Sequence, residues 1–328
     1  MVEAMTFWET LPKPFFTLAP MADVTDPAYR RLIAQVHAPD VMWTEFVSAD
    51  GLYHTREKKG MNDEENPLVR DLLFVEQERP VVAQFFSAKK DMMEYASRLA
   101  LSRGFDGVDI NMGCPDKTIE KQGAGAAHMK DPERAKEVIA GAIAGVEGKI
   151  PVSVKTRIGY NTITYKEWLP HLLTAGISAL TIHLRTRKEM SLVDAHWELG
   201  KEIVEFCRSI NPHVVLIGNG DVQDLPDARE KARTTGFDGI MFGRAIFGNP
   251  WLFSGQTTHH PLEKLDALLT LARYFSELRP VKHFAIMKKH VKAFVNGFDG
   301  AADARVALMN TNSFEEFEAV IQETRKLV

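Results

Sequence analysis

The sequence is poor in cysteine and has no long apolar run, and both absences limit what the protein can be. Its 328 residues contain two cysteines, Cys114 and Cys207, which are too few and too far apart for a disulfide framework or a cysteine-rich metal site. No apolar run approaches the roughly 18 residues needed to span a bilayer, and the acidic start of the chain is unlike a secretory signal. We therefore expect a cytoplasmic protein without a metal site or a membrane partner.

A large excess of one charge is also missing. The formal net charge is −4, and hydrophobic and charged residues make up 45% and 26% of the chain, which is typical of a folded globular protein. Such a balance gives no global attraction to nucleic acid, so a nucleic-acid partner would need a local basic patch. The length favours one large domain with a smaller one.

Short apolar runs recur along the chain, each followed by turn residues and then by a segment with helical spacing. The runs are rich in Val, Ile and Phe, as expected of parallel strands covered by helices. Eight of them span residues 14–21, 41–47, 80–86, 107–113, 151–157, 179–185, 214–220 and 239–245. The intervening helices are expected at residues 26–36, 90–103, 131–146, 164–176, 197–210 and 224–230.

This alternation predicts an α/β fold of the (β/α)8 or TIM-barrel class. A doubly wound open sheet is the alternative, but the Gly-x-Gly-x-x-Gly turn expected after its first strand is missing. Residues 48–79 exceed a minimal β/α unit, and we expect an extended loop followed by a short hairpin strand at 68–75, as a functional loop or a solvated insertion.

The character of the chain changes after Pro261, where no further strand signal appears. Residues 261–278, 282–298 and 313–328 follow helical periodicity. The sequence therefore predicts a catalytic barrel over residues 1–255 and a small all-helical domain over residues 261–328.

Most of the residues at the predicted strand ends are polar, and these ends are where every barrel of this class places its active site. These residues are Pro20 and Met21; Glu45; Gln84; Asn111 and Cys114; Lys155 and Arg157; His183 and Arg185; Asn219 and Asp221; and Gly243 and Arg244. Interior strand positions are ordinarily apolar, so this concentration indicates a binding site.

The last two strand ends, "IGNGD" and "FGRAIFGNPW", favour a phosphate site. Loops after these strands often bind phosphate through backbone N–H groups, and Arg244 would add a charge-assisted contact. Each glycine alone fits a plain turn, but together they favour a bound phosphate.

Lys155 and His183 end adjacent strands and suit the N1–C2=O edge of a flavin. The amides of Gln84 and Asn111 could bind a flavin, bind a pyrimidine or tie strand ends together.

Cys114 stands in a Gly-Cys-Pro turn directly after the fourth strand. A rigid turn there would hold the thiol over the barrel mouth, where it could act as a nucleophile or as an acid. A lone cysteine is usually a packing residue, but no paired base adjoins this one in the sequence, which makes the acid role the more economical hypothesis. Cys207 lies among helix formers and reads as a buried, inert thiol.

Several longer motifs, taken together and in order, resemble the tRNA-dihydrouridine synthases. They are "LAPMADVTD" (18–26), "VAQFF" (82–86), "DINMGCPDKTIEKQGAGAA" (109–127), "VKTRIG" (154–159), "TIHLRTR" (181–187), "IGNGDV" (217–222), "DGIMFGRAIFGNPWLF" (238–253) and "MKKHVKAFVNGFDGA" in the tail. The resemblance implies an FMN-binding barrel that reduces a uridine of tRNA to 5,6-dihydrouridine, with NADPH reducing the flavin again.

The resemblance also assigns roles to residues, position by position. It implies flavin contacts at Pro20, Met21, Ala22, Gln84, Lys155, His183, Asn219, Gly220, Asp221, Gly243 and Arg244, and uracil contacts at Asn111, Arg157 and Arg185. It implies that Cys114 is the proton donor. Because the C5=C6 bond of uracil is conjugated to the C4 carbonyl, hydride from flavin N5 should reach C6 and Cys114 should protonate C5.

A uridine inside folded RNA must swing out to reach such a pocket, so the rest of the tRNA needs a platform. If residues 281–295 form a helix, Phe284, Met287, Val291, Phe294 and Val295 share one face, with Lys282, Lys288, Lys289 and Lys292 beside it. This spacing fits an RNA contact and ordinary solvated lysines equally well. We expect a monomer.

Two other functions remain open on this reasoning. A flavin oxidoreductase of free pyrimidines or other small enones would use the same barrel chemistry, and an RNA-binding protein could keep the fold without turnover. Activity on free uracil with none on a tRNA transcript would favour the first, whereas a colourless protein that does not oxidise NADPH would favour the second.

Overall fold

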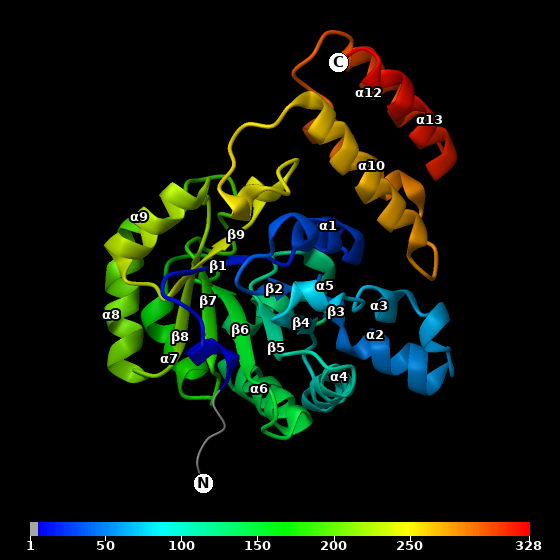
Figure 1. Ribbon diagram of the computed structural model, residues 1–328. Coiled ribbons are helices and arrows are strands. Elements are labelled where there is room, and N and C mark those ends of the chain that lie inside the picture. The colour runs from blue at the N-terminus through cyan, green and yellow to red at the C-terminus, as the bar shows by residue number, and fades with distance from the viewer. Residues whose placement is uncertain (1–5) are drawn as a thin grey trace.

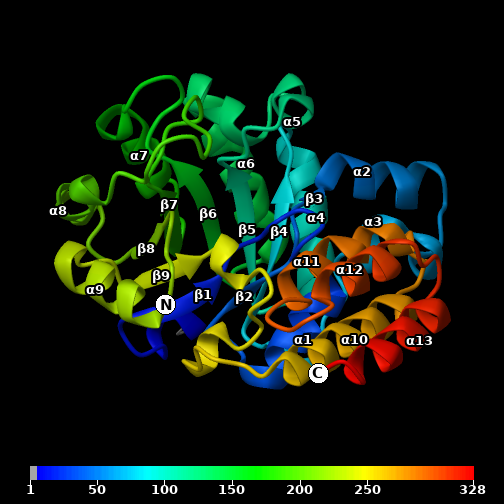
Figure 2. The ribbon, with the colours of Figure 1, turned by 90° about the horizontal axis from the view of Figure 1, so that it is seen from above.

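Parallel strands form a closed ring in this protein (Figure 1, Figure 2). The computed structural model describes residues 6–328, with strands β1 (Phe15–Leu18), β2 (Met42–Trp43), β3 (Val47–Ser48), β4 (Val81–Phe86), β5 (Gly107–Met112), β6 (Val152–Arg157), β7 (Ala179–His183), β8 (Val215–Asn219) and β9 (Gly239–Phe242). They pair in the order β1-β9-β8-β7-β6-β5-β4-β2. A parallel bridge between Thr17 and Val41 joins the ends of this order, which confirms the predicted barrel.

The second strand of the barrel is broken into two pieces. Both β2 and β3 pair with β4, through Met42 with Val81 and through Val47 with Phe85. The segment between them carries Glu45 at the end of the barrel where the other strands finish. All eight predicted strands are thus present, with the second one interrupted.

Helices surround the barrel in chain order, and each predicted barrel helix is confirmed. They are α1 (Pro27–His37), α4 (Lys90–Ser102), α6 (Pro132–Val146), α7 (Tyr165–Leu173), α8 (Gly200–Ile210) and α9 (Leu225–Thr235). The Asp-Pro pairs indicate the starts correctly, because the carboxylates of Asp26 and Asp131 accept hydrogen bonds from N–H groups of the first turn. Gly236 ends α9 in a left-handed conformation.

The predicted hairpin strand at residues 68–75 is wrong, because its first residues belong to helix α3 (Pro67–Arg70) and the described residues between α3 and β4 contain no strand. The extended loop expected before it contains helix α2 (Ala49–Tyr53) and a π-helical turn (His54–Lys58). Asn66 caps α3 by accepting a hydrogen bond from Leu68 N at 3.0 Å, and Pro67 stands at the first helical position. Buried Val69 and Leu72 are three residues apart, which is a helical spacing. A short helix α5 (Lys117–Lys121) after β5 was also not predicted.

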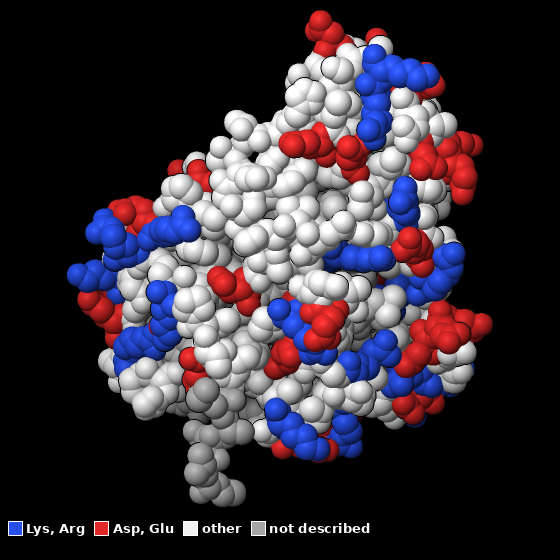
Figure 3. Space-filling view, viewed as in Figure 1, with Lys and Arg blue, Asp and Glu red and all other residues white. Residues whose placement is uncertain are grey.

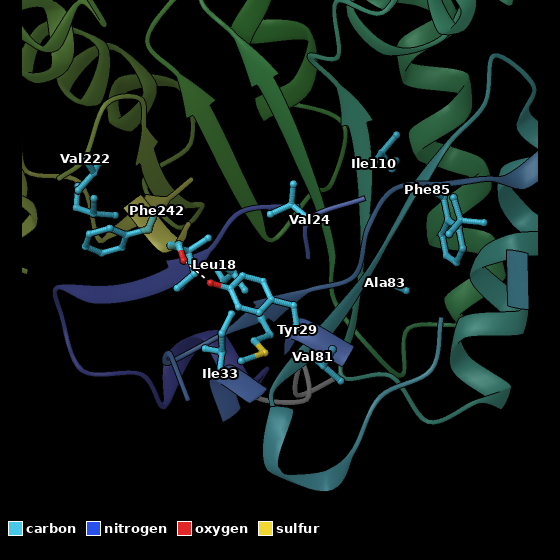
Figure 4. Packing of buried hydrophobic residues seen from close by; sticks show 14 of the residues in the cluster. Leu18, Val24, Tyr29, Ile33, Val81, Ala83, Phe85, Ile110, Val222 and Phe242 are labelled. Atoms are coloured by element: carbon cyan, nitrogen blue, oxygen red, sulfur yellow. Dashed lines mark hydrogen bonds between the residues drawn. The ribbon is translucent and has the colours of Figure 1, made fainter. Parts of the chain in front are cut away.

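The tail of the chain consists of helices that pack beside α1 (Figure 2). They are α10 (Pro261–Glu277), a 3-10 helix (Phe284–His290), α11 (Val291–Phe294), α12 (Ala301–Met309) and α13 (Phe314–Arg325). The helix expected over residues 281–295 therefore begins only at Phe284 and is mostly 3-10, and α12 was not predicted. Tyr29 of α1, which Figure 4 shows packed near Leu18 and Ile33, contacts the ring of His290 in a tilted arrangement, with ring centroids 4.7 Å apart and 51° between the ring planes.

Two apolar layers support the barrel mouth from below and from outside. The inner layer fills the barrel and includes Phe15, Trp43 and Met241, with Trp8 closing its lower end. The outer layer packs the strands against the helices and continues into the tail. Because the barrel interior is filled, a ligand can enter only above it. Among residues 6–328, no helix is long and apolar enough to cross a membrane.

Candidate active site at the barrel mouth

A pocket of about 320 Å³ opens where β1 and β6 to β9 end. Its wall contains most of the residues that the sequence placed there. They are Pro20, Met21, Lys155, Arg157, His183, Arg185, Asn219, Gly220, Asp221, Gly243 and Arg244, joined by Ala19, Pro115, Met190, Ser191 and Val222. The carboxyl ends of five strands thus bring together side chains that are distant in the sequence.

The remaining predicted barrel residues lie beside or beneath this wall. Cys114 directly precedes Pro115 of the wall and is partly buried, whereas Gln84 is completely buried and Asn111 nearly so. Ala22 follows Met21 in the loop after β1 and is exposed.

The wall carries an excess of positive charge. Lys155, Arg157, Arg185 and Arg244 face a single carboxylate, that of Asp221. Burial and, to a lesser extent, the nearby guanidinium of Arg157 together lower the pKa of Lys155 to about 8. Burial likewise lowers the pKa of Arg157 to about 10. Cations that depress each other's pKa in this way would be stabilised by an anionic ligand.

His183 is neutral and has a defined tautomer. Burial first, and then the charges of Arg157, Lys155 and Arg185, hold its pKa well below the ordinary value. Nη1 of Arg185 lies 3.2 Å from Nε2 of His183. Because an arginine nitrogen only donates, Nε2 accepts this bond and Nδ1 carries the proton. His183 can therefore offer one N–H donor to a ligand.

Asp221 orients two arginines at the pocket. Its carboxylate pairs with Arg185 and Arg244 and accepts a hydrogen bond from Ala195 N at 3.0 Å. Burial alone would raise its pKa, but the hydrogen bonds from Arg185 and Ala195 lower it below the ordinary value. The carboxylate thus faces the arginines and keeps their guanidinium groups beside the pocket.

Two glycines let backbone approach the pocket closely. Gly220 has φ 130°, and a Cβ there would lie 2.7 Å from Cβ of Ala195. A Cβ on Gly243 would come no nearer than 3.8 Å to any atom, that atom being Sδ of Met21, so a side chain there would project beside the wall. Without a side chain at either position, the backbone N–H groups of Gly220 and Gly243 are accessible from the pocket, as expected where a phosphate binds to N–H groups.

The side chain of Asn111 holds the turn that carries Cys114. Oδ1 of Asn111 accepts hydrogen bonds from Gly113 N at 3.2 Å and from Cys114 N at 2.9 Å. On the other side, Ala126 N donates to the carbonyl of Cys114 at 2.9 Å. Burial raises the pKa of the Cys114 thiol, which keeps it protonated near neutral pH. A protonated thiol in a rigid turn suits an acid better than a nucleophile.

Two arginines of the wall also hold a loop that sequence reasoning missed. Arg157 donates from Nη1 to the carbonyl of Met190 at 3.0 Å, and Arg185 donates from Nε to that of Val193 at 2.7 Å. Nε of Arg157 donates to the carbonyl of Gly113 at 2.8 Å. The loop after β7 and the cysteine turn therefore share one anchor, which no local motif indicates.

The four predicted lysines of the tail fall into two pairs. Lys282 and Lys288 are each 8% exposed, whereas Lys289 and Lys292 are exposed. Nζ of Lys288 donates to the carbonyl of Met309 at 2.9 Å. Over the face seen in Figure 3, basic and acidic side chains are mixed on both barrel and tail.

Lys282 enters a cluster of carboxylates between the tail and the barrel. Its Nζ lies 3.4 Å from Asp23, 3.5 Å from Glu45 and 3.8 Å from Asp71. We call these four residues the tail joint. Burial raises the pKa of Glu45 to about 7, against the opposing charge of Lys282.

Among residues 6–328, no group of three or more His, Cys, Asp or Glu side chains could hold a metal ion.

Comparisons with known proteins agree with this geometry. Residues 17–327 match the family described as dihydrouridine synthase (Dus). The chain is 40% identical over 321 residues to a probable tRNA-dihydrouridine synthase of Staphylococcus aureus (strain MRSA252), covering 97% of this chain and 95% of the relative. It is 39% identical over 324 residues to probable tRNA-dihydrouridine synthase 2 of Bacillus subtilis (strain 168), covering 97% and 96%.

Solved structures with low sequence identity share the fold. Histamine dehydrogenase from Rhizobium sp. 4-9 aligns with a TM-score of 0.51 at 11% identity, over 84% of this chain and 50% of that one. A 2-naphthoyl-CoA reductase aligns with a TM-score of 0.54 at 10% identity, over 73% and 49%. At this identity the likeness shows the barrel architecture alone.

Proposed function

Because this chain belongs to the dihydrouridine synthase family, and is accordingly a tRNA-dihydrouridine synthase, we propose that it uses FMN as its bound cofactor and NADPH as its reductant. Members of the family are generally flavin-dependent. The observation that carries the proposal is the excess of cations around the pocket, beside a cysteine turn with a protonated thiol.

The residues at the pocket fit a flavin mononucleotide in their chemistry. Backbone N–H groups at Gly220 and Gly243, with the guanidinium of Arg244, would bind the phosphate. Lys155 and Nδ1–H of His183 would donate to the edge of the ring system that becomes anionic on reduction. When bound, the reduced flavin would supply the hydride for C6 of the uracil.

Further contacts to the flavin follow from the sequence assignment. Pro20, Met21 and Asn219 lie on the wall, and Asn219 accepts a hydrogen bond from Nζ of Lys155 at 2.9 Å. We therefore assign Asn219 to the orientation of that lysine. Asp221 acts through the two arginines it binds. Gln84 and Ala22 lie off the wall, and a contact from either to the flavin stays a prediction.

Cys114 protonates C5 of the uracil in this scheme. A neutral thiol is required, and burial keeps it neutral. Arg157 lies between the cysteine turn and the pocket, so its charge would stabilise the enolate oxygen that forms at C4. Asn111 holds the turn, and Arg185 is bound to His183, Val193 and Asp221, so we assign both residues mainly to positioning the site.

The tRNA substrate would rest partly on the tail. Lys289 and Lys292 are exposed and suit phosphate contacts, whereas the buried Lys282 and Lys288 would support that surface from inside. We propose that residues 261–328 form an RNA-binding unit on a barrel of residues 1–255, and that the protein acts as a cytoplasmic monomer.

One experiment tests the proposed function directly. Purified protein supplied with FMN, NADPH and a tRNA transcript should oxidise NADPH and add two hydrogens to one uridine, detected by mass spectrometry of nuclease fragments. A colourless protein that does not retain FMN contradicts the cofactor assignment. Reduction of free uracil with none of the transcript would instead favour the enzyme of small pyrimidines.

A further inference from the structure

Asp109 lies at the base of a chain of buried hydrogen bonds that ends at the cysteine turn. Its carboxylate is completely buried and accepts hydrogen bonds from Oγ of Ser153 at 2.5 Å and from Nε2 of Gln84 at 2.6 Å. Oε1 of Gln84 accepts from Nδ2 of Asn111 at 3.1 Å. Oδ1 of Asn111 in turn accepts from Cys114 N at 2.9 Å.

Asp109 at one end of this series of hydrogen bonds and the backbone of the cysteine turn at the other require the same orientation of the two amides between them. An ionised carboxylate only accepts, so Gln84 must turn its NH2 group toward Asp109 and its oxygen toward Asn111. Asn111 must then turn its NH2 group toward Gln84, which leaves its oxygen for the backbone N–H groups of the turn. Those N–H groups only donate, so they require that same orientation.

Burying a carboxylate without a bonded cation costs folding free energy, which a residue with a purely structural role would not need to spend. Its two bonded partners, Ser153 and Gln84, are neutral, and burial raises its pKa to about 6, although both hydrogen bonds and the nearby charge of Lys155 oppose this rise. An apolar residue would fill the barrel at lower cost. What the carboxylate provides is an acceptor that fixes the orientation of the next amide.

We propose that Asp109 is a positioning residue for the reaction, which acts through Gln84 and Asn111 to hold Cys114 in place beside the pocket. This inference rests on the proposed role of Cys114 as the proton donor. Neither the sequence motif nor the pocket wall assigns a role to Asp109, since it lies beneath the wall.

The test measures the reactivity of the Cys114 thiol as well as turnover. Purified protein with its FMN is treated with iodoacetamide at neutral pH, and alkylation is followed by peptide mass spectrometry. Cys207 is an internal reference, since it is fully buried and its pKa is raised by burial to about 12. Asp109→Leu should speed alkylation of the partly buried Cys114 about tenfold and slow turnover about tenfold. The reason is that the series of hydrogen bonds from Asp109 to Cys114 loses the carboxylate that orients Gln84.

Asp109→Asn should recover both properties toward the wild type. Its Oδ1 can still accept from Gln84 while its Nδ2 donates to Ser153, so the orientation of the chain survives without the charge. Ser153→Ala is the matched control, because it removes a hydrogen bond to the same carboxylate outside the chain and should leave Cys114 alkylation unchanged. If Asp109→Leu does not fold, Gln84→Met removes the amide that bonds to both Asp109 and Asn111, and it should speed alkylation of Cys114 equally.

Two results would overturn the inference. One is a wild-type alkylation rate in Asp109→Leu or in Gln84→Met. The other is an Asn variant as impaired as the Leu variant, because charge rather than orientation would then be the cause. Failure of the proposed function is separate: a fully active Cys114→Ala would remove the acid role, whereas the alkylation rates would still report whether Asp109 holds the turn.

Discussion

Lys155, which is half-buried, and Lys282, which is buried, show how differently the barrel mouth and the tail joint use charge. At the mouth, burial and the charge of Arg157 lower the pKa of Lys155 to about 8. At the joint, burial alone would lower the pKa of Lys282, but the charges of Glu45 and Asp71 raise it above the ordinary value. The charge of Lys282 is therefore balanced by the carboxylates of the joint itself, whereas the cations of the mouth outnumber the one carboxylate of its wall and favour an anionic ligand.

The largest expected effect tests whether the mouth is the chemical site. Cys114→Ala removes the proposed acid and should lower turnover by at least about a hundredfold. It leaves every cation of the wall in place, so FMN should be retained. Dihydrouridine formation in a tRNA transcript and the visible absorbance of the protein measure the two properties. Undiminished turnover would remove Cys114 from the chemistry.

The next effect concerns the ligand that neutralises the mouth. Lys155→Met should weaken FMN binding about tenfold or more, because a charge-assisted contact is lost. The protonated form of Lys155 is present below its pKa of about 8 and is lost above it, so wild-type affinity should fall as the pH rises past 8. Fluorescence titration from pH 6 to 9 measures both.

A matched control separates this effect from general loss of a lysine. Lys201→Met changes an exposed lysine of α8 that lies 3.9 Å from Glu205, and it should leave FMN affinity and its pH dependence as in the wild type. If Lys155→Met keeps the fall in affinity above pH 8, another group of the mouth is responsible for it.

A substitution in the joint should change the stability of the protein. The effect of Lys282→Met should grow as pH rises, whereas the effect of Lys155→Met on FMN affinity should shrink. Lys282→Met leaves Glu45 buried without its cation, with Asp23, Asp26 and Asp71 nearby, and should lower the free energy of unfolding by about 2 kcal/mol. The folded variant must keep Glu45 protonated, and the uptake of that proton costs more as pH rises. Denaturant unfolding should therefore show a larger loss at pH 8 than at pH 6. An equal loss at both values would contradict this account of Glu45.

The sequence predicts the mouth better than the joint, for a physical reason. Strand ends converge in any closed parallel barrel, so residues such as Lys155 and His183 can be placed together from the apolar runs alone. The joint depends on how the tail docks on α1, and no local period encodes that contact. For this reason the spacing of residues 281–295 could not separate Lys282 from Lys289.

The same limit explains the other differences between sequence and structure. The helices at residues 49–70 read as a loop because they are short and irregular, although the Asn66-Pro67 cap was present. The amides of Gln84 and Asn111 were recognised at their strand ends. That they bond to each other and to Asp109 follows from the register of β4, β5 and β6, which pairs Gln84 with Asp109 and Asp109 with Ser153.

The smallest expected effect distinguishes the exposed lysines of the tail from the buried one. Lys289→Met with Lys292→Met should weaken tRNA binding and reduce the slope of log affinity against log salt by about one to two, because each lysine that contacts a phosphate releases a counterion. Lys282→Met should leave that slope unchanged, since its charge is neutralised inside the joint. Binding measured between about 50 and 200 mM salt compares them. An unchanged slope in the double variant would place the RNA on another face, and a reduced slope in Lys282→Met would mean that the joint opens to admit a phosphate.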